Sequence, residues 1–511
     1  MRIGIVAESA ATETRVAATP ATVDRLVKLG YQVAVESGAG DDAQYSNAAF
    51  ADAGATVVDG DEAWSCDIVL KVTAPTGAEV GRLREGSALV GLLSPALDPD
   101  LLDALTARRV TGLSMDAVPR ISRAQSMDVL SSMANIAGYR AVVEAVHEFG
   151  RFLPGQVTAA GKVPAAKILV AGAGVAGLAA IGAASRLGAI VRATDPRPEV
   201  ADQVASVGGQ YLPVEVDEQM QSTDGYAKAT STDYDRLAAA LYSEQARDVD
   251  IIITTALIPG RPAPRLITAA DVAAMRAGSV IVDMAAGQGG NVEGSVPGGR
   301  VVTDNGVTIL GYTDLAGRLP AQASQLYGTN VVNLLKLLTP EHDGQLDIDL
   351  DDVVQRAITV THQGELLWPP PPTQVSVAPA AAIAPVAPQR SEEAPIRRRW
   401  TAPVLLSAGL AALFWVIAAA PPPLPQHFTV LLLAIVIGYY VIGKVHHALH
   451  TPLMSVTNAI SGIIVVGAML QLGVDQPAVR VLAFVAVLAA GVNVFGGFAV
   501  TRRMLGMFSK G

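Results

Sequence analysis

Cysteine and charge are both scarce in this sequence. Cys66 is the single cysteine and cannot form an intramolecular disulfide, so nothing in the sequence indicates an oxidising compartment. Acidic residues outnumber basic ones by 47 to 37, and a formal charge of -10 argues against a nucleic-acid partner, which would need clustered Lys and Arg. Residues 1–7 also lack the basic start and continuous apolar core of a signal peptide. We therefore expect the N-terminal part of the chain to stay in the cytoplasm.

Apolar residues, in contrast, are abundant. They make up 50% of the 511 residues, whereas charged residues make up 16%. The length predicts two or three folding units, because single cores rarely grow so large. The composition predicts that one of these units does not lie in water, because soluble enzymes usually carry more charge.

Short apolar runs alternate with helical stretches along the first two thirds of the chain. This order predicts parallel sheets, and we expect an α/β fold with two Rossmann-like lobes around a cleft. The first lobe should comprise residues 1–125 and 330–367, and the second residues 126–329. A helix at 127–149 would bridge the lobes, and a helix at 330–338 would return to the first. The predicted strands are residues 3–7, 32–36, 68–72, 88–92, 110–114, 167–171, 190–194, 251–255 and 279–283.

The C-terminal part of the chain has a different composition. Residues 368–399 are rich in proline and alanine, which favours an extended linker over a packed core. Residues 400–511 contain stretches without Asp, Glu, Lys or Arg, each about long enough to cross a hydrocarbon core of about 30 Å as a helix. We predict a membrane domain of four transmembrane helices; the alternative, buried helices of a soluble domain, lacks amphipathic partners to cover them. The stretches are 402–420, 427–443, 451–474 and 481–501.

Basic residues gather on one side of these predicted spans. Because basic loops stay in the cytoplasm, this distribution places both ends of the membrane domain there. It agrees with the cytoplasmic location expected for the N-terminal lobes. The residues are Arg397, Arg398, Arg399, Lys444, Arg502, Arg503 and Lys510.

A glycine-rich turn follows one of the predicted strands. Gly172, Gly174 and Gly177 form the pattern G-x-G-x-x-G before a helix of small residues. The first glycine permits a tight turn, the second lets a pyrophosphate approach the backbone at a helix N-terminus, and the third lets helix and strand pack. The next predicted strand ends before Asp195, whose carboxylate would accept the ribose hydroxyls of NAD(H) and repel the 2′-phosphate of NADP(H), although Arg197 could pair with such a phosphate. The pattern therefore predicts one NAD(H) site, in the second lobe, and a second dinucleotide would need another polypeptide.

Several longer strings are specific enough to indicate a family. They are Glu13-Thr-Arg-Val-Ala-Ala-Thr-Pro20, Pro119-Arg-Ile-Ser-Arg-Ala-Gln-Ser-Met-Asp128, Ser131-Ser-Met-Ala-Asn-Ile-Ala-Gly-Tyr-Arg140, Gly225-Tyr-Ala-Lys228, Thr254-Thr-Ala-Leu-Ile-Pro-Gly260, Ser324-Gln-Leu-Tyr-Gly-Thr-Asn330 and His450-Thr-Pro-Leu-Met-Ser-Val-Thr-Asn-Ala-Ile-Ser-Gly462. Over the whole length, the chain resembles the alpha subunit family of proton-translocating NAD(P) transhydrogenases.

This resemblance implies an enzyme in which NAD(H) on this chain exchanges hydride directly with NADP(H) on a beta subunit. It implies coupling to proton translocation, mainly with NADH reducing NADP⁺ while protons move inward, and activity only with the beta subunit. The expected assembly is an alpha homodimer within a heterotetramer, in the lipid of the bacterial inner membrane. Because the predicted spans hold no Asp, Glu, Lys or Arg, and His427 lies at the end of one of them, we expect the proton path on the beta subunit. We predict no metal site, since the pair His446 and His450 lacks acidic or Cys companions.

The resemblance also implies the site residues. The residues expected to hold and orient the nicotinamide or to close the site are Arg120, Gln125, Asp128, Ser131 and Tyr226, and those expected to contact NAD(H) are Gly172, Gly174, Val175, Gly177, Gln125, Ser126, Met127, Asp128, Asp195, Pro196, Arg197, Gly225 and Leu257. Tyr226 would lie on a mobile loop at 219–232 that closes over the nucleotide and excludes water. For Gln125 and Asp128 the alternative is a cap on the helix that follows them.

Alanine dehydrogenase, a soluble NAD enzyme with the same two-lobed fold, is the nearest alternative, because its motifs recur around Arg15 and Lys71. That family needs a His within residues 90–96 and an Asp at the position of Gly287, and both are absent. Without them the imine chemistry lacks a proton donor, so Arg15 and Lys71 are expected to be structural remnants. A membrane-bound NAD(H) sensor without turnover is a further alternative, which the motifs alone leave open.

Overall fold

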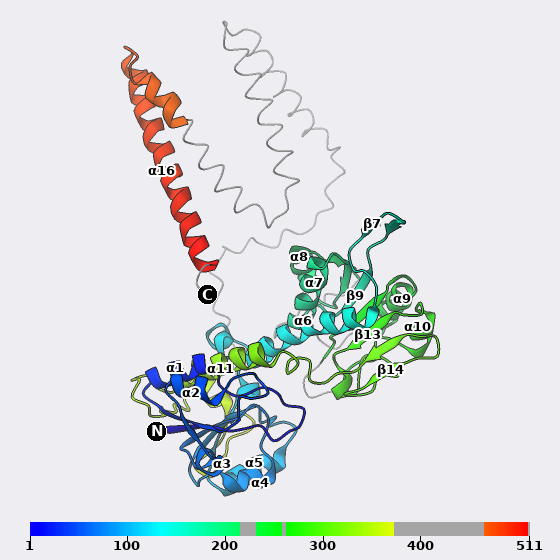
Figure 1. The fold of residues 1–511 in the computed structure, drawn as a ribbon, viewed down its shortest axis with the longest axis vertical. Coiled ribbons are helices and arrows are strands. Elements are labelled where there is room, and N and C mark those ends of the chain that lie inside the picture. Colours follow the sequence, from blue (N-terminus) through cyan, green and yellow to red (C-terminus); the bar gives the residue numbers. More distant parts are fainter. Residues whose placement is uncertain (215–230, 258–261, 372–463, 509–511) are drawn as a thin grey trace, which may run out of the picture. The chain divides into compact units, whose positions relative to one another are not determined.

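The computed structural model describes residues 1–214, 231–257, 262–371 and 464–508. The chain divides into two compact units, Met1–Ser376 and Val377–Gly511. The described part of the first unit contains two large, mostly parallel sheets and a separate hairpin (Figure 1).

The first sheet has eight strands in the order β17-β16-β6-β5-β4-β1-β2-β3. The strands from β1 to β6 pair in parallel, whereas β16 runs antiparallel to β6 and β17 antiparallel to β16. The strands are β1 (Arg2–Ile5), β2 (Gln32–Glu36), β3 (Thr56–Val58), β4 (Ile68–Leu70), β5 (Ala88–Gly91), β6 (Thr111–Ser114), β16 (Thr359–His362) and β17 (Glu365–Leu366). The connecting helices are α1 (Pro20–Lys28), α2 (Asn47–Asp52), α3 (Gly60–Trp64), α4 (Gly77–Arg82), α5 (Pro99–Ala107), α12 (Val353–Ile358) and the 3₁₀ helix η1 (Met115–Ala117).

Successive side chains of these strands enter two separate cores, because side chains alternate between the faces of a sheet. Ile68 and Leu70 of β4 belong to one buried cluster, which α1 completes with Leu26. Val69 of the same strand belongs to the other cluster, which α3 completes with Trp64. Both faces are therefore covered by helices, as a parallel sheet requires.

The second sheet has seven strands in the order β11-β10-β9-β12-β13-β15-β14. Without the antiparallel edge strand β14, this is the 3-2-1-4-5-6 order of a Rossmann fold. The strands are β9 (Lys167–Ala171), β10 (Ile190–Thr194), β11 (Gln210–Tyr211), β12 (Ile251–Thr254), β13 (Val280–Asp283), β14 (Arg300–Val302) and β15 (Thr308–Leu310). The helices are α7 (Val175–Arg186), α8 (Ala201–Ser206), α9 (Thr232–Asp248), α10 (Ala269–Ala274) and the 3₁₀ helices η3 (Pro198–Val200) and η4 (Ala286–Gln288).

Two long helices connect the sheets, α6 (Val129–Phe149) and α11 (Pro320–Leu337), and they pack against each other (Figure 1). The predicted helix at 127–149 starts slightly later, because residues before Asp128 form the 3₁₀ helix η2 (Ser122–Met127). The predicted helix at 330–338 starts ten residues earlier than expected. Its first residue is Pro320, which suits a first helical turn because it lacks an N–H to leave unpaired.

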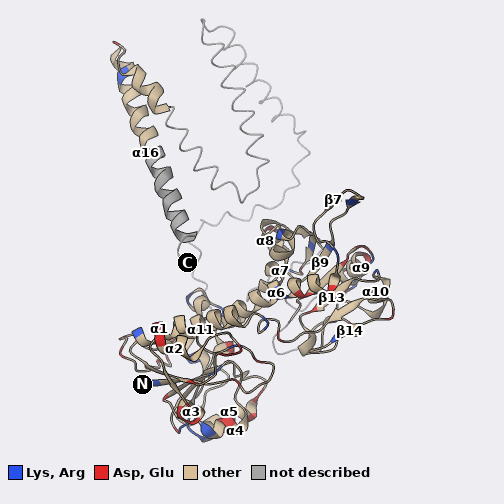
Figure 2. Ribbon diagram, viewed as in Figure 1, with Lys and Arg blue, Asp and Glu red and all other residues tan. Residues whose placement is uncertain are grey.

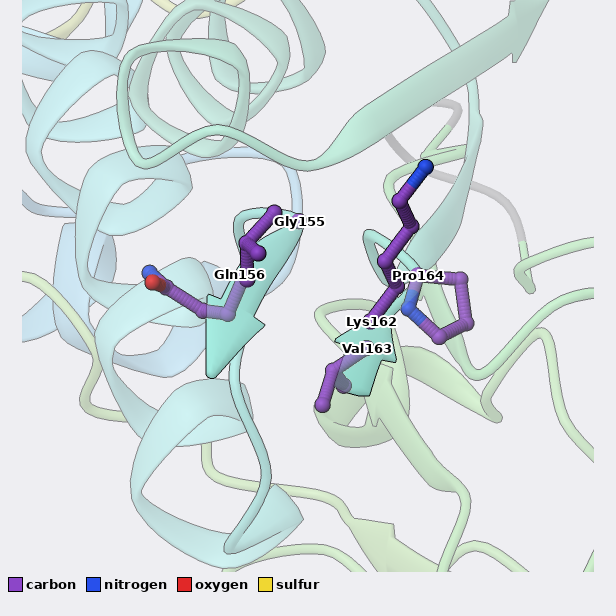
Figure 3. Close-up of a pocket in the computed structure, with 6 residues that line it drawn as sticks. Gly155, Gln156, Lys162, Val163 and Pro164 are labelled. Carbon is purple, nitrogen blue, oxygen red and sulfur yellow. The ribbon is translucent and has the colours of Figure 1, made fainter. Parts of the chain in front are cut away.

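A hairpin of β7 (Gln156–Thr158) and β8 (Gly161–Val163) forms a two-stranded sheet of its own. Val157 is 80% exposed. A shallow pocket lies between the two strands, lined by Gln156, Lys162 and Val163 among others (Figure 3). This pocket is separate from the glycine-rich turn.

The described part of the second unit consists of helical residues 464–471 and α16 (Pro477–Phe508). Arg480 is the charged residue among the described side chains of α16 (Figure 2). Apolar side chains of this helix such as Leu482 and Phe484 are exposed. Within the described stretches, no helix combines the length and the apolarity that a membrane crossing requires. The predicted spans at 402–420 and 427–443 and most of 451–474 lie outside the described residues; 481–501 falls within α16.

The predicted α/β class with Rossmann-like parallel sheets is confirmed. All nine predicted strands form, with ends that differ by at most two residues. Strands β3, β11, β14, β15, β16 and β17 and the hairpin were not predicted.

Candidate functional site

The glycine-rich turn joins β9 to α7 at the carboxyl edge of the second sheet. Gly172 has φ +107°, a conformation that glycine adopts without strain. A Cβ on Gly177 would lie 1.8 Å from the carbonyl oxygen of Gly172, so only glycine lets the helix start this close to the strand. Gly174 is the N-cap of α7 and provides no side-chain cap, which leaves the first N–H groups of the helix for an anion.

A further glycine supports this turn from outside the fingerprint. Gly138 lies in the middle of α6, and a Cβ there would lie 2.0 Å from the carbonyl oxygen of Ala176 in the first turn of α7. The close contact of α6 with α7 thus depends on Gly138. The sequence shows this glycine only as an interruption in a helical stretch, because its contact partner is 38 residues away.

Asp195 follows the last residue of β10, as predicted, and its carboxylate is 5% exposed. Its Oδ1 accepts hydrogen bonds from the backbone N–H of Arg197, at 2.9 Å, and from its Nε, at 2.8 Å. Its Oδ2 accepts from the N–H of Ala173, at 2.8 Å, and from Nη2 of Arg197, at 3.0 Å. A carboxylate has about four acceptor positions, so these donors occupy all of them.

Arg197 therefore lies over the carboxyl edge of the second sheet, beside the glycine-rich turn. Its Nη2 is 4.0 Å from the position that a Cβ of Gly174 would take. The hydrogen bond with Asp195 raises the pKa of Arg197. The backbone oxygen of Asp195 accepts a hydrogen bond from the hydroxyl of Tyr211, at 2.8 Å, and burial raises the pKa of Tyr211 to about 12.

Apolar side chains flank the same edge. Val175, the first residue of α7, is 43% exposed, and Leu257, shortly after β12, is 37% exposed. Pro196 is half-buried beside Asp195. A bare glycine turn, an uncapped helix N-terminus, a carboxylate and apolar walls form a cradle that fits a dinucleotide.

The segment predicted to hold the nicotinamide lies at the start of α6. Asp128 caps this helix: its Oδ1 accepts from the N–H of Ser131, at 2.9 Å, and its Oδ2 from the Ser131 hydroxyl, at 2.6 Å. Arg120, Gln125 and Ser126 are exposed, Ser131 is half-buried, and Met127 is buried with 4% of its surface exposed. The capping alternative thus describes the contacts of Asp128, and a role in cofactor binding stays a prediction.

Helix α11 holds this segment in place. Nδ2 of Asn330 and Nδ2 of Asn333 both donate to the carbonyl oxygen of Ser126, at 2.9 and 2.8 Å. Arg123 forms an ion pair of 2.6 Å with Asp352. These contacts come from residues over 200 positions away, and no sequence pattern indicates them.

Helix α6 connects the two groups of predicted site residues, the segment at its own start and the glycine-rich turn. Ser131, in its first turn, and Gly138, which touches α7, are seven positions apart. At about 1.5 Å per residue, this spacing is about 10 Å along the helix. Both groups are thus fixed to one rigid element. Tyr226, Gly225 and most of the loop predicted at 219–232 lie outside the described residues.

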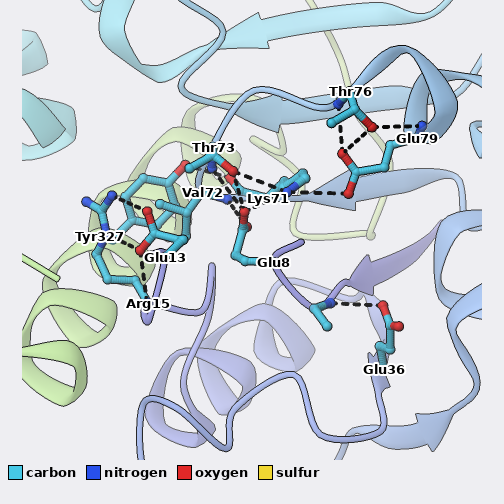
Figure 4. A network of polar contacts seen from close by, with 11 residues as sticks. Glu8, Glu13, Arg15, Glu36, Lys71, Val72, Thr73, Thr76, Glu79 and Tyr327 are labelled. Carbon is cyan, nitrogen blue, oxygen red and sulfur yellow. Dashed lines mark hydrogen bonds and ion pairs between the residues drawn. The ribbon is translucent and has the colours of Figure 1, made fainter. Parts of the chain in front are cut away.

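Arg15 and Lys71 lie in the first sheet's half of the unit, in a buried polar network (Figure 4). The side chain of Lys71 is fully buried, and its Nζ lies 2.6 Å from Oε2 of Glu8. The backbone oxygen of Lys71 accepts a hydrogen bond from the Tyr327 hydroxyl, at 2.7 Å. Arg15 forms an ion pair of 2.6 Å with Glu13. Both cations are neutralised inside the lobe, which is compatible with the predicted structural role. Among the described residues, no group of His, Cys, Asp and Glu could hold a metal ion.

Family models match nearly the whole chain. The model "Alanine dehydrogenase/PNT, N-terminal domain" matches residues 4–137, and the corresponding C-terminal domain matches residues 141–369. The model "4TM region of pyridine nucleotide transhydrogenase" matches residues 427–510. The NAD(P) transhydrogenase subunit alpha of Haemophilus influenzae is 55% identical over 518 residues, covering 100% of both chains. The chain belongs to the NAD(P) transhydrogenase alpha subunit family.

Membership of this family makes the chain part of an oxidoreductase and implies that it binds NAD(H). The structure of the transhydrogenase from Sinorhizobium meliloti, 40% identical, matches with a TM-score of 0.63 and covers 72% of this chain and 99% of that one. The alanine dehydrogenase of Mycobacterium tuberculosis is 33% identical over 303 residues, 58% of this chain and 76% of that protein. Alanine dehydrogenase is therefore a more distant relative, and the region of residues 427–510 associates the chain with a membrane.

Proposed function

We propose that this chain is the NAD(H)-binding subunit of a proton-translocating NAD(P) transhydrogenase. Bound NAD(H) would supply the hydride for NADP⁺ held on a beta subunit, or accept one from NADPH. The observation that carries this proposal is the cradle of Gly172, Gly174 and Gly177 beside Asp195, in a chain 55% identical to a transhydrogenase alpha subunit. NADP(H) on the partner is supported by the presence of only one such fingerprint in this chain.

The residues at the carboxyl edge of the second sheet would bind and select the nucleotide. The N–H groups that begin α7 would hold the pyrophosphate, and Val175 and Leu257 would flank the adenosine. Asp195 would accept the hydroxyls of the adenosine ribose and repel a 2′-phosphate, which favours NAD(H) over NADP(H). Since Arg197 occupies this carboxylate, the ribose would have to take its place.

The residues at the start of α6 would orient the nicotinamide. Arg120, Gln125, Asp128 and Ser131 are proposed to set the position of the ring, so that hydride can pass without a covalent protein intermediate. The rigid hold of Asn330 and Asn333 on Ser126 supports this role, because a positioning segment must itself be fixed. Closure of the loop at 219–232, with Gly225 and Tyr226, would exclude water.

The C-terminal part would anchor the enzyme in the bacterial inner membrane through four helices, with both ends in the cytoplasm. The match of residues 427–510 to a four-helix transhydrogenase region and the gathering of basic residues on one side of the predicted spans support this topology. An inward proton would contribute about 2.3 kcal/mol per 100 mV and favour NADPH formation. The proton path is proposed to lie on the beta subunit.

The proposed assembly is an alpha homodimer within a heterotetramer. The hairpin of β7 and β8 and the residues just before it support contact with a second copy, because Val157 of β7 is 80% exposed and Phe152, four residues before β7, is 57% exposed. Exposed apolar patches, rather than single side chains, mark interfaces between subunits.

The test uses membranes that contain this chain together with its beta partner. With NADPH and an oxidised NAD analogue, we expect reduction of the analogue, and membranes without the partner serve as the control. Dissipating the proton gradient should change the steady-state rate and the nucleotide ratio. Binding of nucleotide without turnover in the complete complex would contradict the proposal and favour a sensor, while turnover of pyruvate, ammonia and NADH would favour an alanine dehydrogenase.

A further inference from the structure

Asn291 is a buried residue at the nucleotide edge of the second sheet, eight positions after the end of β13. Its side chain is fully buried. Its Nδ2 donates to the carbonyl oxygen of Ala256, at 2.9 Å, and to that of Pro264, at 2.7 Å. One carboxamide thus holds two points of the chain that follows β12.

The backbone of Asn291 is itself fixed by a buried carboxylate. Oδ1 of Asp283, fully buried at the end of β13, accepts from the N–H of Asn291, at 3.2 Å, and Oδ2 accepts from that of Val292, at 3.2 Å. The carbonyl oxygen of Asn291 accepts from the N–H groups of Leu266 and Ile267. Gly290, with φ +74°, completes the turn, since a Cβ there would lie 2.7 Å from Oδ2 of Asp283.

The carbonyl that Asn291 holds belongs to the wall of the nucleotide site. Ala256 stands between Thr255, whose hydroxyl donates to the carbonyl oxygen of Gly172 at 3.0 Å, and Leu257, 37% exposed at the same edge. Holding Ala256 therefore sets the position of Leu257 and supports the first glycine of the fingerprint from the side.

The acceptor atom of Asn291 shows that stability alone is a poor explanation. Its Oδ1 is buried and has no hydrogen-bond partner among the described residues. A buried unpaired acceptor destabilises a fold. The fold nevertheless leaves this acceptor unpaired and keeps the two hydrogen bonds from Nδ2 to Ala256 and Pro264.

We infer that Asn291 is a positioning residue for NAD(H) binding, which fixes the Ala256–Leu257 wall against the glycine turn. The inference rests on the proposed function, because it assigns this edge of the sheet to NAD(H). Asn291 is not proposed to touch the nucleotide or to take part in hydride transfer.

The test compares Asn291→Ala with Asn305→Ala in the complete alpha–beta complex. Asn305 is a matched control, because its Nδ2 also donates to backbone carbonyls, those of Val272, Ala273 and Met275. It lies just before β15, at the opposite, amino edge of the same sheet. Binding of NADH is measured by calorimetry, together with kcat and with KM for NADH and for NADPH.

We expect Asn291→Ala to weaken NADH binding and to raise its KM about 10-fold, through the loss of two hydrogen bonds. The KM for NADPH and kcat at saturating NADH should stay within about twofold of the parent, because the partner site and the reacting ring are unchanged. Asn305→Ala should leave NADH binding unchanged. Asn291→Ser, which retains one donor, should restore part of the affinity.

Equal NADH affinity in Asn291→Ala and the parent would overturn the inference, as would equal losses in both alanine variants. Failure of both Asn291 variants to fold would also overturn it, because Asn291 would then be a requirement of the fold. If the parent binds NADH without turnover and Asn291→Ala weakens that binding, the transhydrogenase proposal fails while the positioning role stands. If the parent binds no NADH, both fail.

Discussion

Replacing Asp195 by alanine should reverse the nucleotide preference of the chain. The substitution removes the carboxylate that would accept the adenosine ribose and releases Arg197 from its ion pair. The backbone oxygen of Asp195, which holds Tyr211, is unaffected. The local fold should therefore survive the change.

The size of the effect follows from the hydrogen bonds on this carboxylate. Two charge-assisted bonds to a ribose contribute about 1.5–3 kcal/mol each, but the ribose must first displace Arg197, which offsets part of the gain. We expect a net loss of about 2–3 kcal/mol for NADH, a decrease in affinity of about 30- to 150-fold. NADPH should bind about 10-fold more tightly, because the repulsion ends and Arg197 can pair with the 2′-phosphate.

The assay is calorimetric titration of the chain with NADH and with NADPH. Asp195→Ala/Arg197→Ala should keep the loss for NADH and abolish the gain for NADPH, which isolates the contribution of the guanidinium. Asp248→Ala is the matched control: Asp248 also forms ion pairs, with Lys167 at 2.5 Å and Arg192 at 2.7 Å, but Lys167 begins β9 at the amino edge. A change in NADH affinity of less than about threefold in folded Asp195→Ala would refute the assignment of this carboxylate.

Two further predictions concern stability. Gly138→Ala should destabilise the chain by about 1–3 kcal/mol, because the new Cβ would lie 2.0 Å from the carbonyl oxygen of Ala176. Gly182→Ala in α7, whose Cβ would have its nearest neighbour at 3.7 Å, should be neutral or stabilising by up to about 1 kcal/mol. Urea unfolding measures both free energies, and equal values would contradict the packing argument. Burial raises the pKa of Asp352, but Arg123 and two backbone amides outweigh it, so the pKa is lower in the folded chain than in the unfolded chain. The stability that Asp352 contributes is therefore complete above about pH 4 and is lost as the pH falls through the pKa of the folded chain. Asp352→Asn should make the free energy of unfolding less dependent on pH in this acid range, and an unchanged dependence would refute the prediction.

The sequence predicted those parts of the fold that depend on local patterns. The central strands are continuous apolar runs, and the turn from Gly172 to Gly177 needs glycine for reasons visible within six residues. Strand β16, in contrast, pairs with β6 across about 250 residues, and its short alternating sequence gives no separate signal. Helix α6 starts later than predicted because Asp128 caps it. The alternative interpretation of Asp128, a helix cap, had predicted this contact.

The candidate site divides in the same way. The place of Asp195 after its strand was predictable from spacing. The hydrogen bonds from Arg197 to its carboxylate were not, because a sequence does not show which way a guanidinium points. Asn291, Asn330 and Asn333 are ordinary polar residues by pattern. Their importance comes from carbonyl groups that only the fold brings to them.

The length of α6 between its cap and its contact with α7 has a consequence for how the chain can vary. A helix turns by about 100° per residue, so one residue inserted between Ser131 and Gly138 would rotate the capped end by that angle about the helix axis. The nicotinamide segment and the glycine turn would then face different directions. Insertions and deletions are thus excluded from this stretch.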